Sequence, residues 1–459
     1  MSNEANPFIA LPAPRSTPYG KLRALGFPAN EASLPLETDV VIIGGGINGV
    51  MSAYFLARRG VRVLLCEKAE IACESSSRAF GWVSELLLDP VKMPLSAESR
   101  RLWREVHEDV GETGYRQYGL AYLAEGQDEL DFFQGWLDNV RGSASPDIHM
   151  MTAADVRTRF PGAAQDWAGG ILAPSDGGTE PQLSATVVAQ AARRAGATIV
   201  TGCAVRTLDI AAGRVAGVIT EHGPVRAQQV LFAGNAWSRL FCGNHGIDVP
   251  QLMFHMSMGR TGPVPDGPAG AGGRDSWAWR KQLDGGYSLG RVAGQKVPVT
   301  RDCIQLFSRF LPAIKAEWRN ISLSFGNDCY TDWRRPRRWR ANDISPMERE
   351  RVLNPVCDSG VADASLALNR QAFPAFDGAE VTEYWSGILT ATPDNMPIAS
   401  AVEKLPGLYL LTGCSYGLSW APALGKMMAD LIIGTPPSLD PNPFRHARFF
   451  DGTPIRLTH

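Results

Sequence analysis

The sequence predicts an α/β protein of two domains: one built from βαβ units and interrupted in sequence, the other an α+β domain with an antiparallel sheet. An apolar, β-branched run at 40–43 is followed by glycines with the spacing GxGxxG and then by a helical pattern. Two later apolar runs also end at glycines, Gly234 and Gly413. Residues 248–384 differ, since they contain many tryptophans, an expected hairpin and few strong helix signals.

The first βαβ unit has the features of a dinucleotide site, which makes the first domain Rossmann-like. Gly44 allows a tight turn after the strand, and Gly46 lets the backbone approach a pyrophosphate. Gly49 lets the following helix pack closely on the strand. The N–H groups near Ile47 and Asn48 begin that helix, and we expect them to point at the phosphates with the positive end of the helix dipole.

An acidic residue ends the second strand of this unit. Glu67 follows the alternating run 61–66, about twenty residues after the glycines, where a carboxylate can accept hydrogen bonds from both ribose hydroxyls. A 2′-phosphate at this position would be repelled by the carboxylate, so NADP is disfavoured. The neighbouring Lys68 is also expected to contact the cofactor.

A polar loop follows the unit and offers hydroxyl groups, backbone N–H groups and one guanidinium to a bound ligand. The start of a capped helix is the alternative interpretation of the same residues. The residues expected to contact the ligand are Ser75, Ser76, Ser77, Arg78, Gly81 and Trp82.

Two later segments return to the same site. The strand that begins at Gln229 ends in bare backbone, with Ala233, Gly234 and Trp237 expected near the nucleotide. A strand after Gly407 is followed by a glycine loop and a helix, an order that again places N–H groups over an anionic or electron-rich group. A second such loop implies a large cofactor. Its expected contacts are Gly413, Tyr416, Gly417 and Leu418.

Length and composition exclude several classes of protein. With 459 residues, of which 44% are apolar, the chain can fill the cores of two domains. A net charge of −2 gives no general attraction to nucleic acid or anionic membranes. The eight cysteines are scattered without a CxxC pair, and no cluster has metal-ligand spacing. No apolar run reaches spanning length and no signal peptide is recognised, so a cytoplasmic protein with reduced thiols is expected.

Two segments have no evident part in the site. Residues 1–36 contain six prolines, which predict an extended arm across the surface. Residues 334–340 hold the densest run of arginine. A patch for nucleic acid is one interpretation, but acidic residues flank the run and Pro336 prevents a continuous basic helix. A segment held by internal salt bridges is the favoured interpretation.

The ordered combination of these motifs, together with the segment 392–398, resembles the D-amino-acid oxidase family over roughly residues 38–435. That family contains FAD-dependent glycine oxidase, sarcosine oxidase, dimethylglycine dehydrogenase and opine oxidase subunits. The resemblance implies FAD in its elongated form, with the first glycines on the pyrophosphate, Glu67 on the ribose and the backbone of Val205 on the adenine. The serine loop would meet the phosphates and the flavin edge, and the late glycine loop would close over the isoalloxazine.

The resemblance also bears on the flavin linkage and the domain boundaries. Relatives that tether flavin use a cysteine where this chain has Gly387, or a histidine near the segment 80–82, so noncovalent FAD is expected. The expected domains are a proline-rich arm at 1–36, a FAD-binding domain at 37–115, 163–247 and 385–440, a substrate domain at 116–162 and 248–384, and a C-terminal tail at 441–459.

One residue of the family's substrate site is missing. Relatives that oxidise glycine or D-amino acids bind the substrate carboxylate with an arginine on the strand that here spans 384–390, and this strand has none. Either Arg260, Arg280 or Arg291 meets a carboxylate instead, or the substrate is an amine that lacks one. The residues expected over the reacting face are Trp82, His255, Trp279, Tyr287, Arg291 and Tyr416.

Each of these residues also has a structural interpretation. Trp279 and Tyr287 fit equally well as core aromatics of the sheet, and His255 has the alternation of a structural strand residue. The function implied is FAD-dependent oxidation of a C–N bond in an amine or N-substituted amino acid, with hydride passing to flavin and the imine hydrolysing. The alternatives are a flavin-binding subunit of a hetero-oligomeric opine or amine dehydrogenase, and a flavoprotein that oxidises a hydroxy acid.

Overall fold

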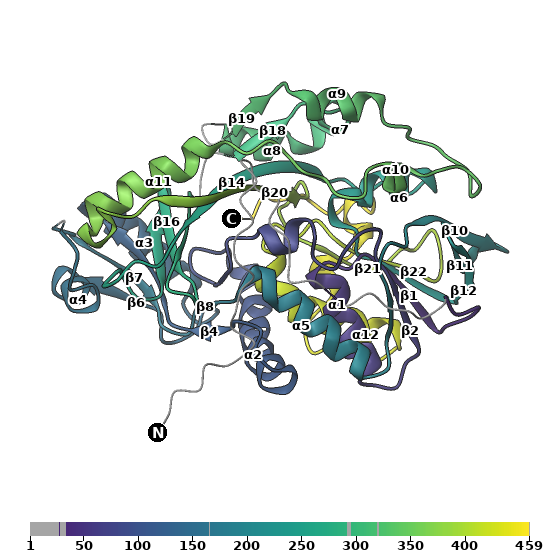
Figure 1. The fold of residues 1–459 in the computed structure, drawn as a ribbon, viewed down its shortest axis with the longest axis horizontal. Coiled ribbons are helices and arrows are strands. Elements are labelled where there is room, and N and C mark those ends of the chain that lie inside the picture. Colours follow the sequence, from purple (N-terminus) through teal and green to yellow (C-terminus); the bar gives the residue numbers. More distant parts are fainter. Residues whose placement is uncertain (1–26, 28–33, 165, 292–294, 319–320, 459) are drawn as a thin grey trace.

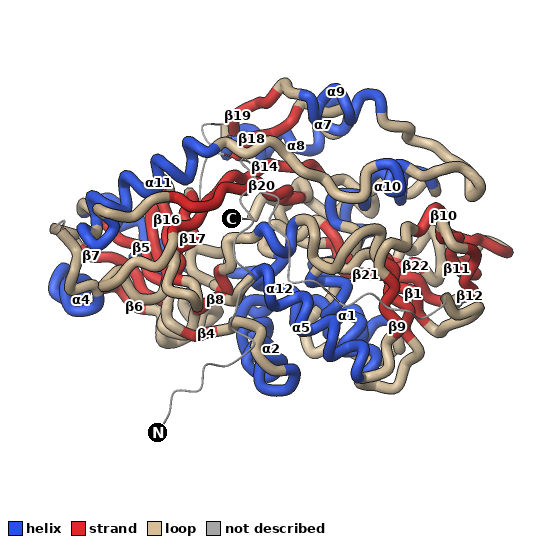
Figure 2. The backbone as a smooth tube through the Cα atoms, viewed as in Figure 1, coloured by secondary structure: helices blue, strands red, loops and turns tan. Residues whose placement is uncertain are grey.

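The computed structural model describes residues 27, 34–164, 166–291, 295–318 and 321–458. Two sheets dominate this part of the chain, and Figure 2 shows their strands on opposite sides of a central group of loops and helices. The prolines of the expected N-terminal arm fall almost entirely outside the described residues. None of the helices in the described part combines the length and the apolarity that a membrane crossing needs.

The first sheet has six strands in the order β21, β22, β13, β1, β2, β9. Its strands pair in parallel except for β21, which is antiparallel to β22. Successive residues of an extended strand face opposite sides of the sheet. A strand that is covered on both sides therefore needs apolar residues throughout. The strands are β1 (Val40–Ile43), β2 (Val63–Cys66), β9 (Thr198–Val200), β13 (Gln229–Phe232), β21 (Ile398–Ala401) and β22 (Leu408–Thr412).

Each face of this sheet is covered by a different layer, as strand β1 illustrates. Val40 and Ile42 belong to the core under the helices, whereas Val41 and Ile43 belong to the core under a three-stranded meander. The helical layer (Figure 1) contains α1 (Ile47–Ala57), α2 (Met93–Val110), α5 (Pro181–Arg194) and α12 (Gly417–Ile432). The meander contains β10 (Val205–Ala211), β11 (Arg214–Thr220) and β12 (Gly223–Arg226).

The second sheet has ten strands and is mainly antiparallel, as expected. Helix α11 (Ser359–Ala372) packs against it over a core rich in aromatic rings. The strands are β5 (Leu120–Ala124), β6 (His149–Thr152), β7 (Gly169–Ala173), β14 (Leu252–Thr261), β15 (Ala271–Arg274), β16 (Trp277–Lys281), β17 (Tyr287–Gly290), β18 (Gln295–Pro298), β19 (Ile321–Ser324) and β20 (Val381–Ala391).

Two strands lie in a different sheet from the one that the expected boundaries imply. The expected boundaries place residues 169–173 and 385–391 in the FAD-binding domain, but β7 pairs with β5 and β6, and β20 pairs with β14 along almost its full length. The long pair β14 and β20 extends from the second sheet toward the first (Figure 1). The apolar pattern of a strand predicts that it is buried, but it does not predict which strand pairs with it or in which register.

Smaller elements connect and cover the two sheets. Helix α8 follows α7 beside β18 and β19, and the short strands β3, β8 and β4 form a further three-stranded sheet. These elements are α3 (Gln127–Val140), α4 (Ala153–Arg159), α6 (Ser238–Asn244), α7 (Arg301–Gln305), α8 (Phe307–Glu317), α9 (Asn327–Arg334), α10 (Pro346–Arg349), β3 (Trp82–Val83), β4 (Arg116–Gln117) and β8 (Gly177–Gly178).

The arginine run takes part in ion pairs within the fold. Arg335 pairs with Asp332 and Glu350, and Arg337 pairs with Asp332 and Asp302. Asp332 and Asp302 are themselves buried, so these pairs join α7, α9 and the segment after it. The geometry agrees with the interpretation of the run as a salt-bridged structural segment.

Candidate functional site

One cavity of about 1750 Å³ runs between the two sheets. Sites for drug-sized ligands occupy about 300 to 1,000 Å³, so this cavity has room for a large cofactor together with a substrate. Its walls come from the β1–α1 loop, the serine loop, the ends of β2 and β13, strands β14 and β20, and the loop before α12. Segments that are far apart in the sequence therefore meet in one site.

The glycine loop has the geometry that a pyrophosphate needs. Gly44 has a φ of +114°, and a Cβ on Gly49 would lie 2.0 Å from the carbonyl oxygen of Gly44. These two glycines are required by the turn and by close packing of the helix on the strand. Gly46 lines the cavity, where a Cβ would lie 3.1 Å from Ser76 Oγ and otherwise in open space. The loop thus leaves an open cradle that a side chain would fill, as expected for a bound phosphate group.

The start of helix α1 differs in one respect from the expectation. The backbone N–H of Ile47 donates to Ser76 Oγ at 2.9 Å, so this donor serves the protein and does not point freely at a phosphate. Asn48 lines the cavity, and its buried Oδ1 atom has no hydrogen-bond partner among the described residues. An orphaned buried polar atom beside an open cradle fits a site built for a polar ligand.

Glu67 lies where a ribose is expected, in the wall of the cavity and only 7% exposed. Its carboxylate is fixed by two backbone donors, Gly45 N at 2.7 Å and Ala69 N at 2.8 Å. Burial raises the pKa of this carboxyl group. Since each carboxylate oxygen can accept more than one hydrogen bond, Glu67 retains acceptor capacity for ribose hydroxyls.

Other predicted residues at this end of the cavity also line it. Lys68 donates to Glu74 Oε1 at 3.0 Å and to the backbone oxygen of Arg351, and its ammonium lies 4.9 Å from the Trp237 ring centre. These bonds make Lys68 part of the wall that holds Trp237 in place. Val205, Ala233, Gly234 and Trp237 all contribute to the lining.

The serine loop forms a short 3-10 turn (Ser75–Arg78), and its residues point in different directions. Ser75 and Ser76 line the cavity, whereas Ser77 is buried away from it and donates to the backbone oxygen of Glu74 at 3.3 Å. The expected cofactor contact of Ser77 is therefore wrong. A tight turn rotates successive side chains to different faces, which the run of three serines did not reveal.

Arg78 lines the cavity, but its guanidinium donates to protein carbonyl groups. Nη1 donates to Leu353 O at 3.1 Å and Ser386 O at 3.2 Å, and Nη2 donates to Cys73 O at 3.3 Å. These contacts brace the serine loop against β20. Nε of Arg78 is buried and has no hydrogen-bond partner among the described residues, so a contact of this side chain with the cofactor stays a prediction.

The late glycine loop closes the opposite end of the cavity. Tyr416, Gly417 and Leu418 line it at the start of α12, where the positive end of the helix dipole lies. Gly413 does not line the cavity; its φ is +69°, and a Cβ there would lie 2.7 Å from Thr392 Cγ2. Gly413 is therefore needed for close packing of two loops, and the expectation that it touches the cofactor is wrong.

Alternate residues of strand β14 line the cavity. Phe254, Met256 and Met258 line the cavity, and His255 points to the other face because neighbouring strand residues alternate. His255 Nδ1 lies 3.7 Å from Asp328 Oδ2, and burial lowers the pKa of the imidazole. The prediction of His255 over the reacting face is wrong.

Two predicted aromatic residues are core residues. Trp279 is fully buried, and its ring stacks on Trp277 with centres 5.4 Å apart. Tyr287 is also fully buried and donates through its hydroxyl to Pro268 O at 2.9 Å. Neither lines the cavity, so the core interpretation of both holds. The remaining predicted residues, Trp82, Arg291 and Tyr416, do line it, as do Gly81 and Gly387.

Among the three arginines expected to meet a carboxylate, Arg260 and Arg280 do not line the cavity. Arg260 pairs with Asp284, and Arg280 pairs with Glu180 at 3.0 Å and donates to Phe80 O at 2.7 Å. Arg280 is fully buried outside the cavity. Arg291 lines the cavity and is the one of the three placed to reach a substrate.

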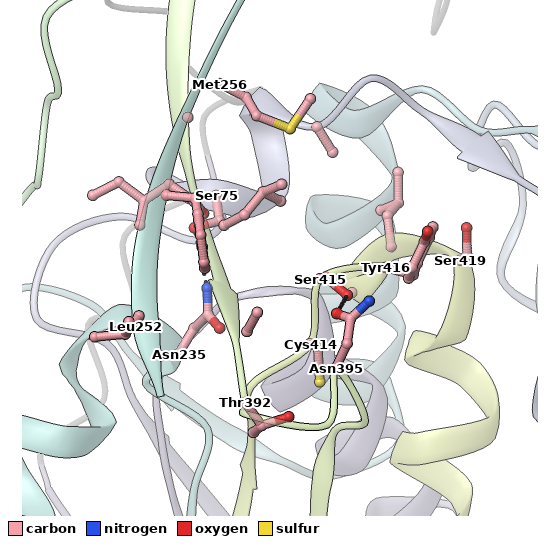
Figure 3. Close-up of a pocket in the computed structure, with 18 of the residues that line it drawn as sticks. Ser75, Asn235, Leu252, Met256, Thr392, Asn395, Cys414, Ser415, Tyr416 and Ser419 are labelled. Atoms are coloured by element: carbon pink, nitrogen blue, oxygen red, sulfur yellow. Dashed lines mark hydrogen bonds between the residues drawn. The ribbon is translucent and has the colours of Figure 1, made fainter. Parts of the chain in front are cut away.

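Several lining residues were not predicted. Figure 3 shows Ser75 with Asn235 on one side and Asn395 with Ser415 on the other, and the hydroxyl of Ser415 donates to Asn395 Oδ1 at 2.9 Å. Asn395 lies in the recognised segment 392–398, which was a usable signal. No sequence signal marked Leu457 or the apolar residues that α8 adds to the walls, Phe307, Phe310, Ala313 and Ile314.

Comparison with known proteins identifies the family. Residues 39–431 match the family "FAD dependent oxidoreductase". An L-amino acid deaminase structure from Proteus myxofaciens, solved with anthranilate, superposes with a TM-score of 0.90 at 32% identity, covering 94% of this chain and 98% of that one.

Two curated relatives extend the comparison. Sarcosine dehydrogenase of Homo sapiens is 29% identical over 98% of this chain but 46% of its own length, so the chain spans about half of that relative. Glycine oxidase of Geobacillus kaustophilus is 25% identical over 89% of this chain and 97% of its own. The match over most of the chain and the open glycine cradle lead to one conclusion: this chain belongs to the FAD-dependent oxidoreductase family that includes the D-amino-acid oxidases.

Proposed function

We propose that this chain oxidises the C–N bond of an amino acid or N-substituted amino acid whose carboxylate pairs with Arg291. The observation that carries the proposal is the position of Arg291 in the cavity wall, whereas Arg260 and Arg280 do not line the cavity. A guanidinium can bind a carboxylate through two parallel hydrogen bonds, which fixes orientation as well as charge. This arginine would replace the one missing from β20.

FAD, when bound, would accept a hydride from the carbon next to the substrate nitrogen. The chain itself would hold the cofactor with Gly44, Gly46 and Glu67 at the nucleotide end and with Tyr416 and the start of α12 at the flavin end. No histidine lines the described part of the cavity. The protein's contribution would then be orientation of a neutral amine and exclusion of water.

The apolar walls support a substrate with an apolar substituent. Phe254, Met256 and Met258 from β14 face the cavity, and Phe310 and Ile314 from α8 continue the surface. Burial of apolar surface contributes about 25 cal/mol for each Å², so a larger substituent in contact with these walls would bind more tightly. We therefore propose that substrates with larger apolar groups have lower KM values than glycine or sarcosine.

FAD is expected to be released when the protein is denatured. Gly387 and the segment 80–82 offer no cysteine or histidine for a covalent bond at the two tether positions. Cys414 lines the cavity, but burial raises the pKa of its thiol to about 12, which keeps it protonated and poorly nucleophilic. Yellow colour that stays with the denatured chain would contradict noncovalent binding.

Anaerobic reduction of the bound flavin tests the proposed reaction. The panel contains α-amino acids and N-methyl amino acids of increasing apolar size, amines without a carboxylate, and hydroxy acids. We expect amino acids to bleach the flavin, and Arg291→Met to slow them far more than an amine that lacks a carboxylate. Arg291→Lys keeps the charge and should restore part of the rate. A flavin that only hydroxy acids reduce, or that no compound reduces, would overturn the proposal.

We propose as a second possibility that the chain is a flavin-binding subunit of a hetero-oligomeric dehydrogenase, as its resemblance to opine oxidase subunits implies. Turnover by the purified chain with an artificial electron acceptor would show that no partner is required for the reductive half-reaction. We also propose a cytoplasmic location, which the eight unpaired cysteines support. Cell fractionation with an antibody to the chain tests it.

A further inference from the structure

We propose that residues 453–458 are part of the cofactor site, and that Lys92 and Asn395 hold this segment, named here the closing strap, against the flavin end of the cavity. Leu457 of the closing strap lines the cavity together with Asn395, Ser415 and Tyr416. The inference uses the membership of this chain in the FAD-dependent family and does not depend on which amine is the substrate.

Thr458 is fixed by four hydrogen bonds to residues far away in the sequence. Its backbone N–H and its hydroxyl donate to the carbonyl oxygen of Asp394 at 3.1 and 2.7 Å. Its own carbonyl oxygen accepts from Asn395 Nδ2 at 3.1 Å and from Lys92 Nζ at 3.1 Å. A surface segment without a role in packing has no need for such a set of contacts, which satisfy both backbone groups of one residue.

Lys92 contributes a charge that is unusual in its burial. The side chain is 0% exposed, and its ammonium lies 5.4 Å from the Tyr416 ring centre and 5.9 Å from that of Trp420. A buried ammonium needs compensating partners, and here they include two aromatic faces and the Thr458 carbonyl group. Lys92 thereby connects the closing strap to the loop and helix at the flavin end.

Asn395 links Thr458 to Ser415, a residue that lines the cavity, through two hydrogen bonds. While its Nδ2 donates to Thr458, its Oδ1 accepts from Ser415 Oγ at 2.9 Å (Figure 3). Asn395 has a φ of +56°, a conformation that asparagine tolerates better than most residues. Both Asn395 and Ser415 line the cavity, so displacement of Thr458 would remove a partner from a residue of the site.

Residues before and within the closing strap also contact the rest of the fold. Arg448, which precedes the closing strap, donates to both carboxylate oxygens of Asp394, at 2.7 and 3.0 Å. Ile455 packs on the core beneath the meander, and Leu457, two residues later, faces the cavity. The closing strap thus forms a fixed wall, and its loss would open the flavin end to water.

Titration of the apoprotein with FAD, followed by the quenching of flavin fluorescence, tests the proposal. The variants are Leu457→Ala, which removes the wall contact, and Thr458→Pro, which removes both the N–H and the hydroxyl that donate to the carbonyl oxygen of Asp394. Arg456→Ala is the matched control, because Arg456 directly precedes the two substituted positions and its side chain is exposed. Urea unfolding of each apoprotein measures whether the fold is retained.

We expect FAD to bind about tenfold more weakly to both variants than to Arg456→Ala. For Leu457→Ala this is the change that loss of one aliphatic contact produces, and for Thr458→Pro it follows from displacement of the strap. The absorption bands of the flavin that remains bound should shift toward those of free FAD. If Thr458→Pro does not fold, Leu457→Ala decides the matter. Equal FAD affinities and equal spectra in Leu457→Ala and Arg456→Ala would overturn the proposal. A failure of the amine panel with unchanged FAD binding would overturn only the proposed substrate.

Discussion

Replacement of Lys92 by methionine should change the pH dependence of stability in a defined direction. Burial lowers the pKa of the Lys92 ammonium from 10.5 to about 8, and the carboxylates of Asp89 and Asp394 offset only part of this effect. Methionine has a similar length and no charge, so Lys92→Met removes the titration while filling most of the same space. The fully buried position makes the protein interior the cause of the lowered pKa.

The sign follows from the protons bound in each state. Between pH 8 and 10.5 the unfolded chain keeps the proton on Lys92 and the folded chain has lost it, so the free energy of unfolding rises with pH in this window. A pKa that falls from 10.5 to about 8 corresponds to about 3 kcal/mol over the whole window. Below pH 8 both states are protonated, and the contribution of Lys92 is constant.

Urea unfolding of the wild type and of Lys92→Met at several pH values from about 7.5 to 10 measures this contribution. Other groups titrate in the same window with the opposite sign, since burial raises the pKa of Cys73 and Cys414 to about 12 and the folded state then holds protons that the unfolded chain releases. The difference between the two proteins cancels these groups. The difference in free energy of unfolding should shift in favour of the wild type by about 3 kcal/mol as pH rises. A difference that does not vary with pH would refute the reasoning.

Four further substitutions test other parts of the structure. Gly46→Ala should fold but bind FAD about tenfold more weakly by fluorescence titration, because its Cβ enters the open cradle. Gly49→Ala should instead lower the free energy of unfolding of the apoprotein by about 3 kcal/mol in urea, since its Cβ would clash with backbone. If Gly46→Ala and Gly49→Ala changed FAD affinity and unfolding free energy by equal amounts, these separate roles would be refuted. Arg100→Met leaves two buried carboxylates without their ion pair and should cost about 3 to 5 kcal/mol of stability in the same assay. His255→Asn should leave kcat/KM within about twofold, because the side chain points away from the cavity.

The nucleotide end of the site could be predicted from the sequence because its determinants are local. Gly44, Gly46 and Gly49 lie within one turn and one helix start, and Glu67 lies at the end of the next strand. Each acts through backbone geometry or through a fixed position in the βαβ unit, which the pattern of apolar residues and glycines specifies. For the same reason the late loop before α12 was recognised, with only Gly413 assigned to the wrong side.

The substrate face could not be predicted in the same way, because strand register decides it. His255 and Met256 are neighbours, and a shift of one residue in β14 would exchange the one that lines the cavity. The same holds for the tryptophans of the second sheet, since Trp279 faces the aromatic core formed with Phe160 and Phe373. Composition shows that such residues are large and apolar, and it does not show which side of the sheet they occupy.

Long-range polar contacts form a third class that the sequence does not reveal. Lys92 and Thr458 are separated by 366 positions, and no repeat or motif connects them. The same is true of Arg78, whose donors go to carbonyl groups of the segment after α10 and of β20. An arginine or lysine in a motif next to a phosphate site suggests an anion ligand, but a buried cation must first satisfy its own donors, and protein carbonyl groups are the nearest acceptors.

The cofactor end of the cavity depends on backbone geometry, whereas the substrate end depends on side chains. This difference explains how related proteins can keep one cofactor site and differ in substrate. The cofactor is expected to meet backbone at Gly44 and Gly46, and a change of side chain there removes the cradle. The substrate is expected to meet side chains of β14 and α8, such as Met256 and Phe310, which belong to the walls and not to the cradle. A methionine can adapt to different neighbours without loss of packing, so substitutions on these walls alter the fit of a substrate at little cost to the fold. Selection can therefore change the amine while the geometry of the glycine loop remains constant.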